Sequence, residues 1–267
     1  MSKYDIIVLG SGPGGYVTAI RASQLGFKTA IIEKESLGGV CLNWGCIPTK
    51  ALLKSAQVFD YLNHAEDYGL KVEKADKDFG AVVKRSRDVA NGMSKGVQFL
   101  MKKNKIDVIE GFGTLKKGKK VAVKDDKGKT TDYEADHVII ATGARSRELP
   151  SLPQDGKKVI GYRKAMTLEK QPKSMIVVGS GAIGVEFASF YNSMGTDVTI
   201  VEFQPNIVPV EDDDVSKQFE KIYKKKGIKI MTNSSVESVD TSGKKVKAKV
   251  KTKKGEETIE ADIVLSA

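Results

Sequence analysis

One pattern of strand, glycine turn, helix, strand and acidic residue occurs twice in this chain of 267 residues. The first copy begins with the apolar run 4–9, turns at Gly10-Ser-Gly-Pro-Gly-Gly and ends at Glu33. The second begins with the run 174–178, turns at Gly179-Ser-Gly-Ala-Ile-Gly and ends at Glu202. In both copies the acid follows the first glycine by 23 residues. Short, continuous apolar runs are typical of buried parallel strands, so each copy predicts a strand–helix–strand unit.

The glycines of such a turn let the backbone approach a pyrophosphate at a helix N-terminus, where free N–H groups and the helix dipole favour anions. The acid is placed to accept hydrogen bonds from a ribose. A glycine turn without any ligand is the alternative for a single motif, but the full context occurs twice and favours two dinucleotide sites. The predicted binding residues are Gly10, Gly12, Pro13, Gly14, Gly15, Glu33 and Lys34 in the first site, and Gly179, Ser180, Gly181, Ala182, Ile183, Gly184 and Glu202 in the second.

The fold class predicted from this repeat is α/β, with two Rossmann-like dinucleotide-binding domains, each a parallel sheet with helices and a β-meander. We expect the first domain to span 1–148 and the second 149–267, with the crossing at the proline-marked stretch 149–153.

Within these domains, helices are expected to follow the two glycine turns at about 16–25 and 185–194. Residues 51–105 are also expected to be helical. The two β-meanders are predicted from residue 106 to the strand that ends near 140, and over about 228–260.

The chain has only two cysteines, Cys41 and Cys46, in the stretch Gly38-Gly-Val-Cys-Leu-Asn-Trp-Gly-Cys-Ile-Pro-Thr-Lys50. Two thiols this close in sequence can close a small ring as a disulfide, and strained, accessible bridges of this kind are the labile, catalytic ones. The alternatives are two small buried hydrophobic residues or half of a metal site. Only His64 and His137 could add histidine ligands, so we predict no metal.

The cysteine stretch resembles the redox-disulfide motif of the pyridine nucleotide–disulfide oxidoreductases, and within that family it is most similar to the dihydrolipoamide dehydrogenases. The resemblance implies FAD in the first site and NAD in the second. It also implies that Cys41 is the interchange thiol, that Cys46 lies against the flavin, and that Lys50 pairs with Glu186 and stabilises negative charge on the flavin. A solvated helix face is the alternative for Lys50 and Glu186. The resemblance adds these cofactor-binding residues: Gly38, Gly39, Val40, Cys41, Lys50, Gly113, Ala141, Thr142, Gly143 and Val236.

The activity implied is NAD-dependent oxidation of dihydrolipoyl groups through FAD and the cysteine pair. Its partner would be a lipoyl-bearing acyltransferase of a 2-oxoacid dehydrogenase complex or the lipoyl protein of glycine cleavage. NAD is favoured over NADP because the acid Glu202 would repel a 2′-phosphate. Another disulfide reductase of the family, or a fragment that binds FAD or NAD without turnover, are the competing interpretations.

Members of the family continue after a stretch like 263–267 with a second flavin segment and a dimer-interface domain that carries a His–Glu pair. We therefore expect a C-terminally truncated chain with impaired lipoamide turnover. The homodimer is an expectation for full-length members rather than for this chain.

The net charge of +10 raises the question of nucleic-acid binding. Its lysines form short clusters at 102–105, 116–120, 224–226 and 244–254, without a zinc pattern or an aromatic RNA-binding signature. A solvated surface is the favoured interpretation, with no nucleic-acid partner.

No apolar run approaches the roughly 20 residues that span a bilayer. No signal peptide is recognisable, and two cysteines suit a reducing cytoplasm.

Overall fold

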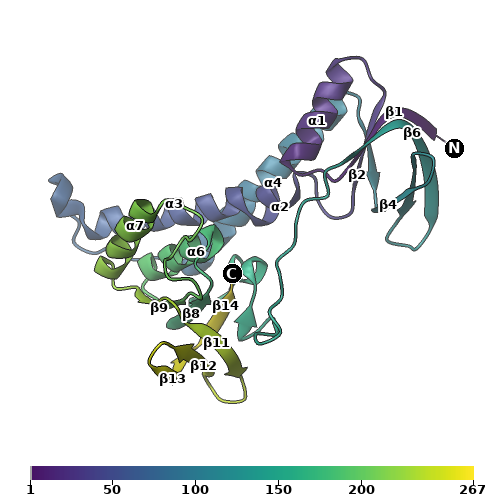
Figure 1. Cartoon of the computed structure of the whole chain (residues 1–267). Coiled ribbons are helices and arrows are strands. Elements are labelled where there is room, and N and C mark those ends of the chain that lie inside the picture. The colour runs from purple at the N-terminus through teal and green to yellow at the C-terminus, as the bar shows by residue number, and fades with distance from the viewer. Residues whose placement is uncertain (1) are drawn as a thin grey trace. The chain divides into compact units, whose positions relative to one another are not determined.

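The computed structural model describes residues 2–267 and contains two compact units, which are treated separately below (Figure 1). Unit 1 combines Met1–Pro48 with Ser86–Arg145, and unit 2 combines Thr49–Arg85 with Ser146–Ala267. The division falls inside two helices, α3 (Cys46–Asn63) and α4 (Phe79–Lys103). Residues 49–85 thus belong with the second unit, whereas the sequence was divided only at 148. The assignment of one cofactor to each domain stays a prediction.

Unit 1 contains one sheet of six strands in the order β3-β2-β1-β6-β5-β4. Strands β3, β2, β1 and β6 are parallel to one another. Strands β5 and β4 continue the sheet beyond β6 as an antiparallel meander. Its elements are β1 (Ser2–Leu9), α1 (Pro13–Gln24), β2 (Thr29–Glu33), α2 (Gly39–Trp44), β3 (Asp107–Glu110), β4 (Phe112–Lys116), β5 (Lys120–Lys124) and β6 (Thr130–Ile140), with the parts of α3 and α4 given above.

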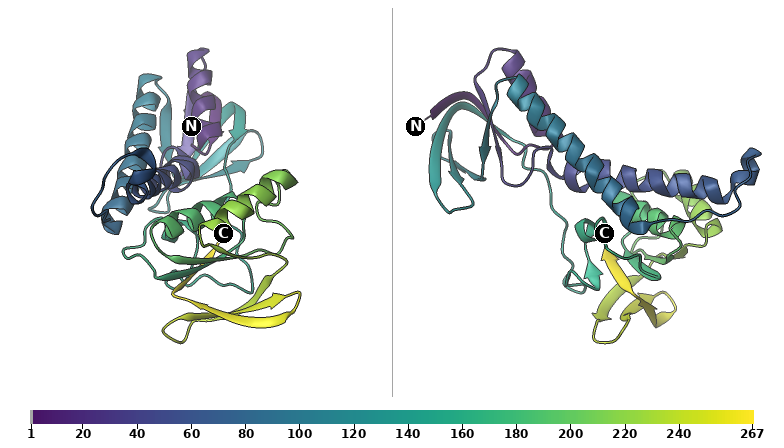
Figure 2. Two further views of the ribbon diagram at one scale, coloured as in Figure 1. Left: turned by 90° about the vertical axis from the view of Figure 1, so that its left-hand side faces the viewer. Right: turned by 180° about the vertical axis from the view of Figure 1, so that it is seen from behind.

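Unit 2 contains a parallel sheet in the order β10-β9-β8-β14-β7 and a separate antiparallel sheet β11-β12-β13. Figure 2 shows the three strands of the second sheet (olive to yellow) side by side as a layer of their own. Besides the remaining parts of α3 and α4, the elements are η1 (Ala65–Tyr68), β7 (Val159–Ile160), α5 (Tyr162–Ala165), β8 (Ser174–Val178), α6 (Ala182–Ser193), β9 (Asp197–Val201), α7 (Asp213–Lys225), β10 (Lys229–Met231), β11 (Ser235–Asp240), β12 (Val246–Thr252), β13 (Gly255–Ala261) and β14 (Ile263–Ser266).

The inner strands β1, β2, β8 and β9 have buried residues on both faces, which explains why they are nearly continuous apolar runs. In unit 2, Met175 and Val177 of β8 pack with the helices, and the alternate residues Ile176 and Val178 pack with the meander. In unit 1, Val8 of β1 packs on the helical side, and its neighbours Ile7 and Leu9 pack on the other. This alternation follows from the two-residue period of a strand.

The internal repeat is visible in the topology. The strands β3-β2-β1-β6 of unit 1 correspond to β10-β9-β8-β14 of unit 2. In both, the strand before the glycine turn lies between the strand that follows the helix and the last strand of the unit. This confirms the predicted α/β fold with parallel sheets, helices and meanders.

Four predicted boundaries were wrong, namely the starts of the two meanders and of two helices. Both meanders begin one strand later than expected, because β3 and β10 join the parallel sheets as partners of β2 and β9. The helices after the glycine turns begin three residues earlier than expected, at Pro13 and Ala182. Each helix starts directly after an extended glycine, so the last residues of the turn already form its first turn.

Candidate functional site

The glycine turn of unit 1 is closed by two contacts that exclude a side chain. Gly10 has φ +93°, and a Cβ there would lie 2.3 Å from the Ala141 carbonyl oxygen. A Cβ on Gly15 would lie 1.9 Å from the Gly10 carbonyl oxygen. These two glycines bring β1, β6 and the start of α1 together at the carboxyl ends of the parallel strands, where dinucleotides bind in such sheets.

Two other glycines of this turn face open space. A Cβ on Gly12 or Gly14 would meet no atom within 4 Å. Gly12 is the extended residue before α1, and Pro13 occupies the first helical position, where a missing N–H costs nothing. The turn therefore offers backbone N–H groups and room beside them, which fits the pyrophosphate of a dinucleotide.

Glu33 lies at the end of β2 and holds the turn in place. Its Oε2 accepts hydrogen bonds from the Ser11 N–H at 3.0 Å and from Ser11 Oγ at 2.5 Å. Its Oε1 accepts from the backbone N–H groups of Lys34 and Glu35 at 2.8 and 2.9 Å. Contact of Glu33 with a ribose stays a prediction, but a role in fixing the turn is visible in the structure.

Unit 2 repeats the main contacts of this arrangement. Gly179 has φ +100°, with a Cβ position 2.6 Å from the Ala267 carbonyl oxygen, and a Cβ on Gly184 would lie 2.1 Å from Gly179 O. Glu202 is buried, and its Oε2 accepts from the Ser180 N–H at 2.7 Å and from Ser180 Oγ at 2.6 Å. Gly181 faces open space as Gly12 does. Two separate units thus carry the same nucleotide-type turn.

The two cysteines lie in unit 1 and are bonded to each other. Cys41 and Cys46 form a disulfide with a Cα–Cα distance of 4.8 Å. Cys41 lies within α2 and is half-buried, whereas Cys46 begins α3 and is exposed. The disulfide follows directly on Gly39, whose Cβ position is 2.7 Å from the Gly12 Cα. The cysteine segment therefore packs against the glycine turn.

Lys50 and Glu186, the pair that the resemblance implies, are in contact within unit 2. Lys50 Nζ donates to Glu186 Oε1. The lysine side chain is 64% exposed and the glutamate 27% exposed. The ion pair joins α3 to α6; its influence on a flavin stays a prediction.

The sequence model of the family described as pyridine nucleotide-disulphide oxidoreductase matches residues 4–267. The chain belongs to this family. The match covers both glycine turns and the disulfide, and it confirms the resemblance seen in the cysteine motif. The family's FAD and NAD chemistry agrees with the two turns described above.

Several similar proteins carry the name dihydrolipoyl dehydrogenase. A dihydrolipoyl dehydrogenase of Rhizobium etli is 52% identical and covers 99% of this chain and 58% of the relative. One from Zymomonas mobilis is 48% identical, covering 92% and 53%, and a mitochondrial one from Pisum sativum is 40% identical, covering 98% and 53%. The chain thus spans little more than half the length of these curated relatives.

Solved structures agree with the fold. LpdA from Mycobacterium tuberculosis superposes with a TM-score of 0.90 at 28% identity, covering all of this chain and 58% of that one. The flavoprotein disulfide reductase RclA from Escherichia coli superposes with a TM-score of 0.82 at 26% identity, covering 99% and 56%.

The remaining predicted cofactor residues occupy diverse places. Gly113 of β4 is packed tightly, since a Cβ there would lie 2.8 Å from Leu9 Cδ2, and Val236 is buried in the core of unit 2. Residues near the first turn are more open: Lys34, Val40, Thr142 and Gly143 are exposed, whereas Ala141 and Gly39 are half-buried and Gly38 is buried. Binding by any of them stays a prediction.

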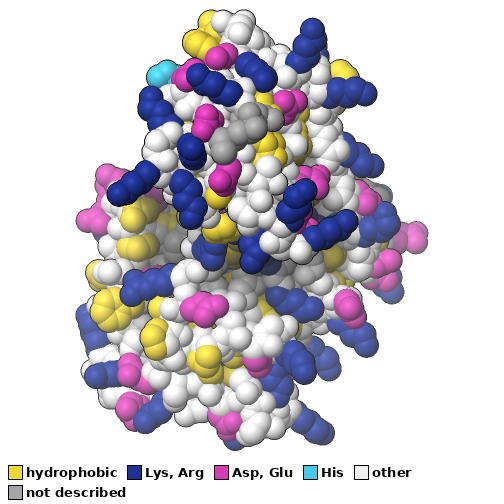
Figure 3. All heavy atoms as spheres, turned by 90° about the vertical axis from the view of Figure 1, so that its right-hand side faces the viewer, with side chains coloured by type: hydrophobic (Ala, Val, Ile, Leu, Met, Phe, Trp, Pro, Cys, Tyr) yellow, Lys and Arg dark blue, Asp and Glu magenta, His cyan; other side chains and the backbone are white. Residues whose placement is uncertain are grey.

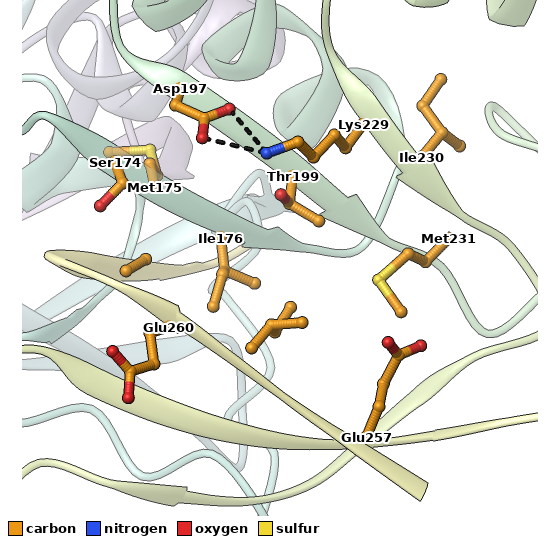
Figure 4. A pocket seen from close by; sticks show the side chains of 12 residues that line it. Ser174, Met175, Ile176, Asp197, Thr199, Lys229, Ile230, Met231, Glu257 and Glu260 are labelled. Carbon is orange, nitrogen blue, oxygen red and sulfur yellow. Dashed lines mark hydrogen bonds and ion pairs between the residues drawn. The ribbon is translucent and has the colours of Figure 1, made fainter. Parts of the chain in front are cut away.

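Two cavities lie away from the predicted sites. One, of about 420 Å³, lies in unit 2 between the parallel sheet and β13, and the Asp197–Lys229 ion pair lines it (Figure 4). Asp197 and Ser174 begin their strands, so this cavity lies at the end of the sheet opposite to the glycine turn. The other, of about 620 Å³, is lined by Leu115, Lys116 and His137 in unit 1. Neither cavity includes a predicted site residue.

Charges are dispersed on the face drawn in Figure 3, where basic side chains stand among acidic and uncharged ones. Several lysines of the sequence clusters form ion pairs within one helix or between paired strands. These pairs include Lys120–Glu134, Lys224–Glu220, Lys247–Glu260 and Lys249–Glu256.

Among residues 2–267 there is no group of His, Cys, Asp and Glu that could hold a metal ion. No helix in that range is long and apolar enough to cross a membrane.

Sequence reasoning did not single out three residues near the disulfide and the first turn. Ser11 is the partner of Glu33, and a signal existed, because both turns read Gly-Ser-Gly. Ser94 and Arg87 of α4 contact the cysteine segment of unit 1. They lie more than 40 residues from that segment in a helix with many polar residues, and nothing in the sequence marks them.

Proposed function

We propose that this chain is the FAD- and NAD-binding part of a dihydrolipoyl dehydrogenase, which oxidises dihydrolipoyl groups with NAD through FAD and the Cys41–Cys46 disulfide. The single observation that carries the proposal is a disulfide in a segment that packs, through Gly39, against the nucleotide-type glycine turn of unit 1. The names of the relatives support the choice of substrate.

The cysteine pair and the first glycine turn are proposed to take different parts in the reaction. Bound FAD would supply two-electron transfer between NAD and the cysteine pair. A dihydrolipoyl dithiol gives two electrons to the disulfide, whose S–S bond breaks to a thiol and a thiolate while the lipoyl group closes its own disulfide. By resemblance Cys41 is the interchange residue, whose sulfur the lipoyl thiolate attacks, and Cys46 faces the flavin. The first glycine turn would hold the FAD pyrophosphate through backbone N–H groups, with room at Gly12 and Gly14.

NAD would bind at the second turn. Glu202 is buried and accepts hydrogen bonds from Ser180, and its carboxylate would repel a 2′-phosphate. No Arg follows Glu202 closely in the sequence. This supports NAD over NADP. The lipoyl-bearing partner would be an acyltransferase or the glycine-cleavage lipoyl protein, in the cytoplasm; a homodimer is proposed only by analogy with full-length members of the family.

An anaerobic reductive titration of the FAD-supplemented chain, followed by visible absorption, tests the proposal. The expected result is uptake of four electrons per bound flavin, with a long-wavelength thiolate-to-flavin band midway. Uptake of only two electrons would mean that the flavin and the disulfide are not coupled. Absence of bound flavin would leave the second candidate, an NAD-binding chain without turnover. Assays with lipoamide beside glutathione disulfide then separate the dihydrolipoyl activity from that of another disulfide reductase.

A further inference from the structure

The segment between the two cysteines is short and is held from outside. Helix α2 has only six residues, too few to be stable alone. Buried Asn43 donates from Nδ2 to the carbonyl oxygens of Leu37 at 3.0 Å and Gly39 at 2.9 Å. Ser94 Oγ of α4 donates to the same Leu37 carbonyl at 2.9 Å. The start of α2 is therefore held by the side chains of Asn43 and Ser94.

Arg87 of α4 contacts the inter-cysteine residues directly. Its guanidinium carbon lies 4.4 Å from the centroid of the Trp44 ring, and Nη2 donates to the carbonyl oxygen of Asn43. Arg87 and Ser94 are seven residues apart on α4, so they lie on one helix face. A single planar side chain thus holds two of the four residues that separate Cys41 from Cys46.

The same guanidinium is incompletely satisfied. Its Nη1 is buried and has no hydrogen-bond partner among the described residues. Burial lowers the pKa of Arg87, because it removes water from around the charge. A desolvated cation of this kind is stabilised by any negative charge that forms close to it.

Reduction of the disulfide creates a negative charge two residues along the chain from Asn43 or Trp44, the residues that Arg87 contacts. Two electrons enter the S–S bond, the bond breaks, and with one proton taken up the products are a thiol and a thiolate. The covalent ring across residues 41–46 is lost at the same time. In the dithiol form Asn43 and Trp44 are held only by non-covalent contacts, so the contacts of Arg87 matter more than in the disulfide form.

We propose that Arg87 is a positioning residue of the redox centre, which keeps Asn43 and Trp44 in place in the dithiol form and favours the thiolate by its charge. The inference rests on the proposed function only in treating the disulfide as redox-active. It requires neither flavin nor NAD, and it can therefore be tested apart from turnover.

The test is the thiol–disulfide equilibrium of the full 267-residue chain with Arg87→Met, without flavin. The protein is equilibrated in buffers of reduced and oxidised dithiothreitol, quenched, alkylated and analysed by mass. The equilibrium constant for reduction should fall about tenfold, equivalent to about 30 mV towards more negative potential. Arg87→Lys keeps the charge without the planar fork, so a smaller shift in the same direction is expected.

Arg85→Met is the matched control. Arg85 lies two residues away on α4, and its Nη1 donates instead to the Ala51 carbonyl at 2.8 Å and to Ser55 Oγ at 3.3 Å in unit 2. This variant removes an equal charge from the same helix but leaves the cysteine segment untouched. Its thiol–disulfide equilibrium should match that of the unaltered chain.

Trp44 is the only tryptophan of the chain, so its fluorescence reports the same contact. Upon reduction the emission should shift further to the red in Arg87→Met than in the unaltered chain, because the ring has then lost its contact with the guanidinium. Should Arg87→Met fail to fold, Trp44→Leu removes the stacking from the other side and should show the same fall in the reduction constant.

An unchanged equilibrium constant in the folded variants, or an equal shift in Arg85→Met, would overturn the proposal and leave Arg87 a structural residue. A chain that shows the expected shift but no electron transfer between flavin and disulfide would retain this inference while the proposed function fails.

Discussion

At the scale of single residues, Asp155 shows how one carboxylate can organise a loop. Its Oδ1 accepts hydrogen bonds from the backbone N–H groups of Lys157, Lys158 and Val159 at 2.7, 2.8 and 2.9 Å, just before β7. Burial by itself would raise the pKa of Asp155, but these N–H groups outweigh it and hold the pKa below its ordinary value of 3.8. The charged form is therefore favoured in the folded state.

Asp155→Asn should destabilise the chain by about 1 kcal/mol near neutral pH, the value for charge-assisted hydrogen bonds discounted for solvent exposure. Because the folded pKa is lowered, the stabilisation is complete above the unfolded value near 4 and is lost as pH falls through the folded pKa. Urea unfolding at pH 7 and at progressively lower pH, where the variant and the original chain should converge, measures this. A difference that stays constant with pH would contradict the ionic origin.

At the scale of elements, the glycine turns divide into positions that close the fold and positions that leave room. Gly10 combines a positive φ with a Cβ position 2.3 Å from Ala141 O, whereas Gly12 has φ −63° and no neighbour within 4 Å. Glycine therefore suits these two positions for different reasons, a closed backbone contact at Gly10 and open space for a ligand at Gly12.

Gly10→Ala should cost at least about 3 kcal/mol of stability, because strain and a backbone clash act together between β1 and β6. Gly12→Ala should change the stability of the apo chain by less than about 1 kcal/mol yet weaken FAD retention at least tenfold, since its methyl group fills the space beside the N–H groups. Thermal unfolding and flavin equilibrium dialysis of both variants separate the two effects. Equal loss of stability in both would show that Gly12 also closes the fold.

At the scale of the whole molecule, two units with the same topology and separate cores are proposed to take different nucleotides. A ligand slows amide exchange most where it binds, because opening must break its contacts. Hydrogen exchange with FAD should protect the start of α1 (Pro13–Gln24), and exchange with NAD the start of α6 (Ala182–Ser193). NADP should protect α6 at least tenfold less readily than NAD at equal concentration. A reversed pattern would exchange the two cofactor assignments.

Much of the architecture was predictable because its signals are local. Apolar runs, glycine spacing and the terminal acids predicted both strand–helix–strand units, and the cysteine motif predicted the redox segment. The starts of the two meanders were wrong because they depend on which strands pair. Strands β3 and β10 are short, and their sequences do not reveal a parallel partner. The role of Ser11 beside Glu33 was also missed, although both turns read Gly-Ser-Gly.

The sequence by itself determined the repeated α/β unit, the two nucleotide-type turns and the cysteine pair, because each depends on residues within about 25 positions of one another. Tertiary structure decided that residues 49–85 pack in unit 2 and that Arg87 stacks on Trp44. It also brought Lys50 and Glu186 together across 136 positions, a pair that only the family resemblance had suggested. Periodicity indicates which face of a helix is buried, but not which distant residue that face meets.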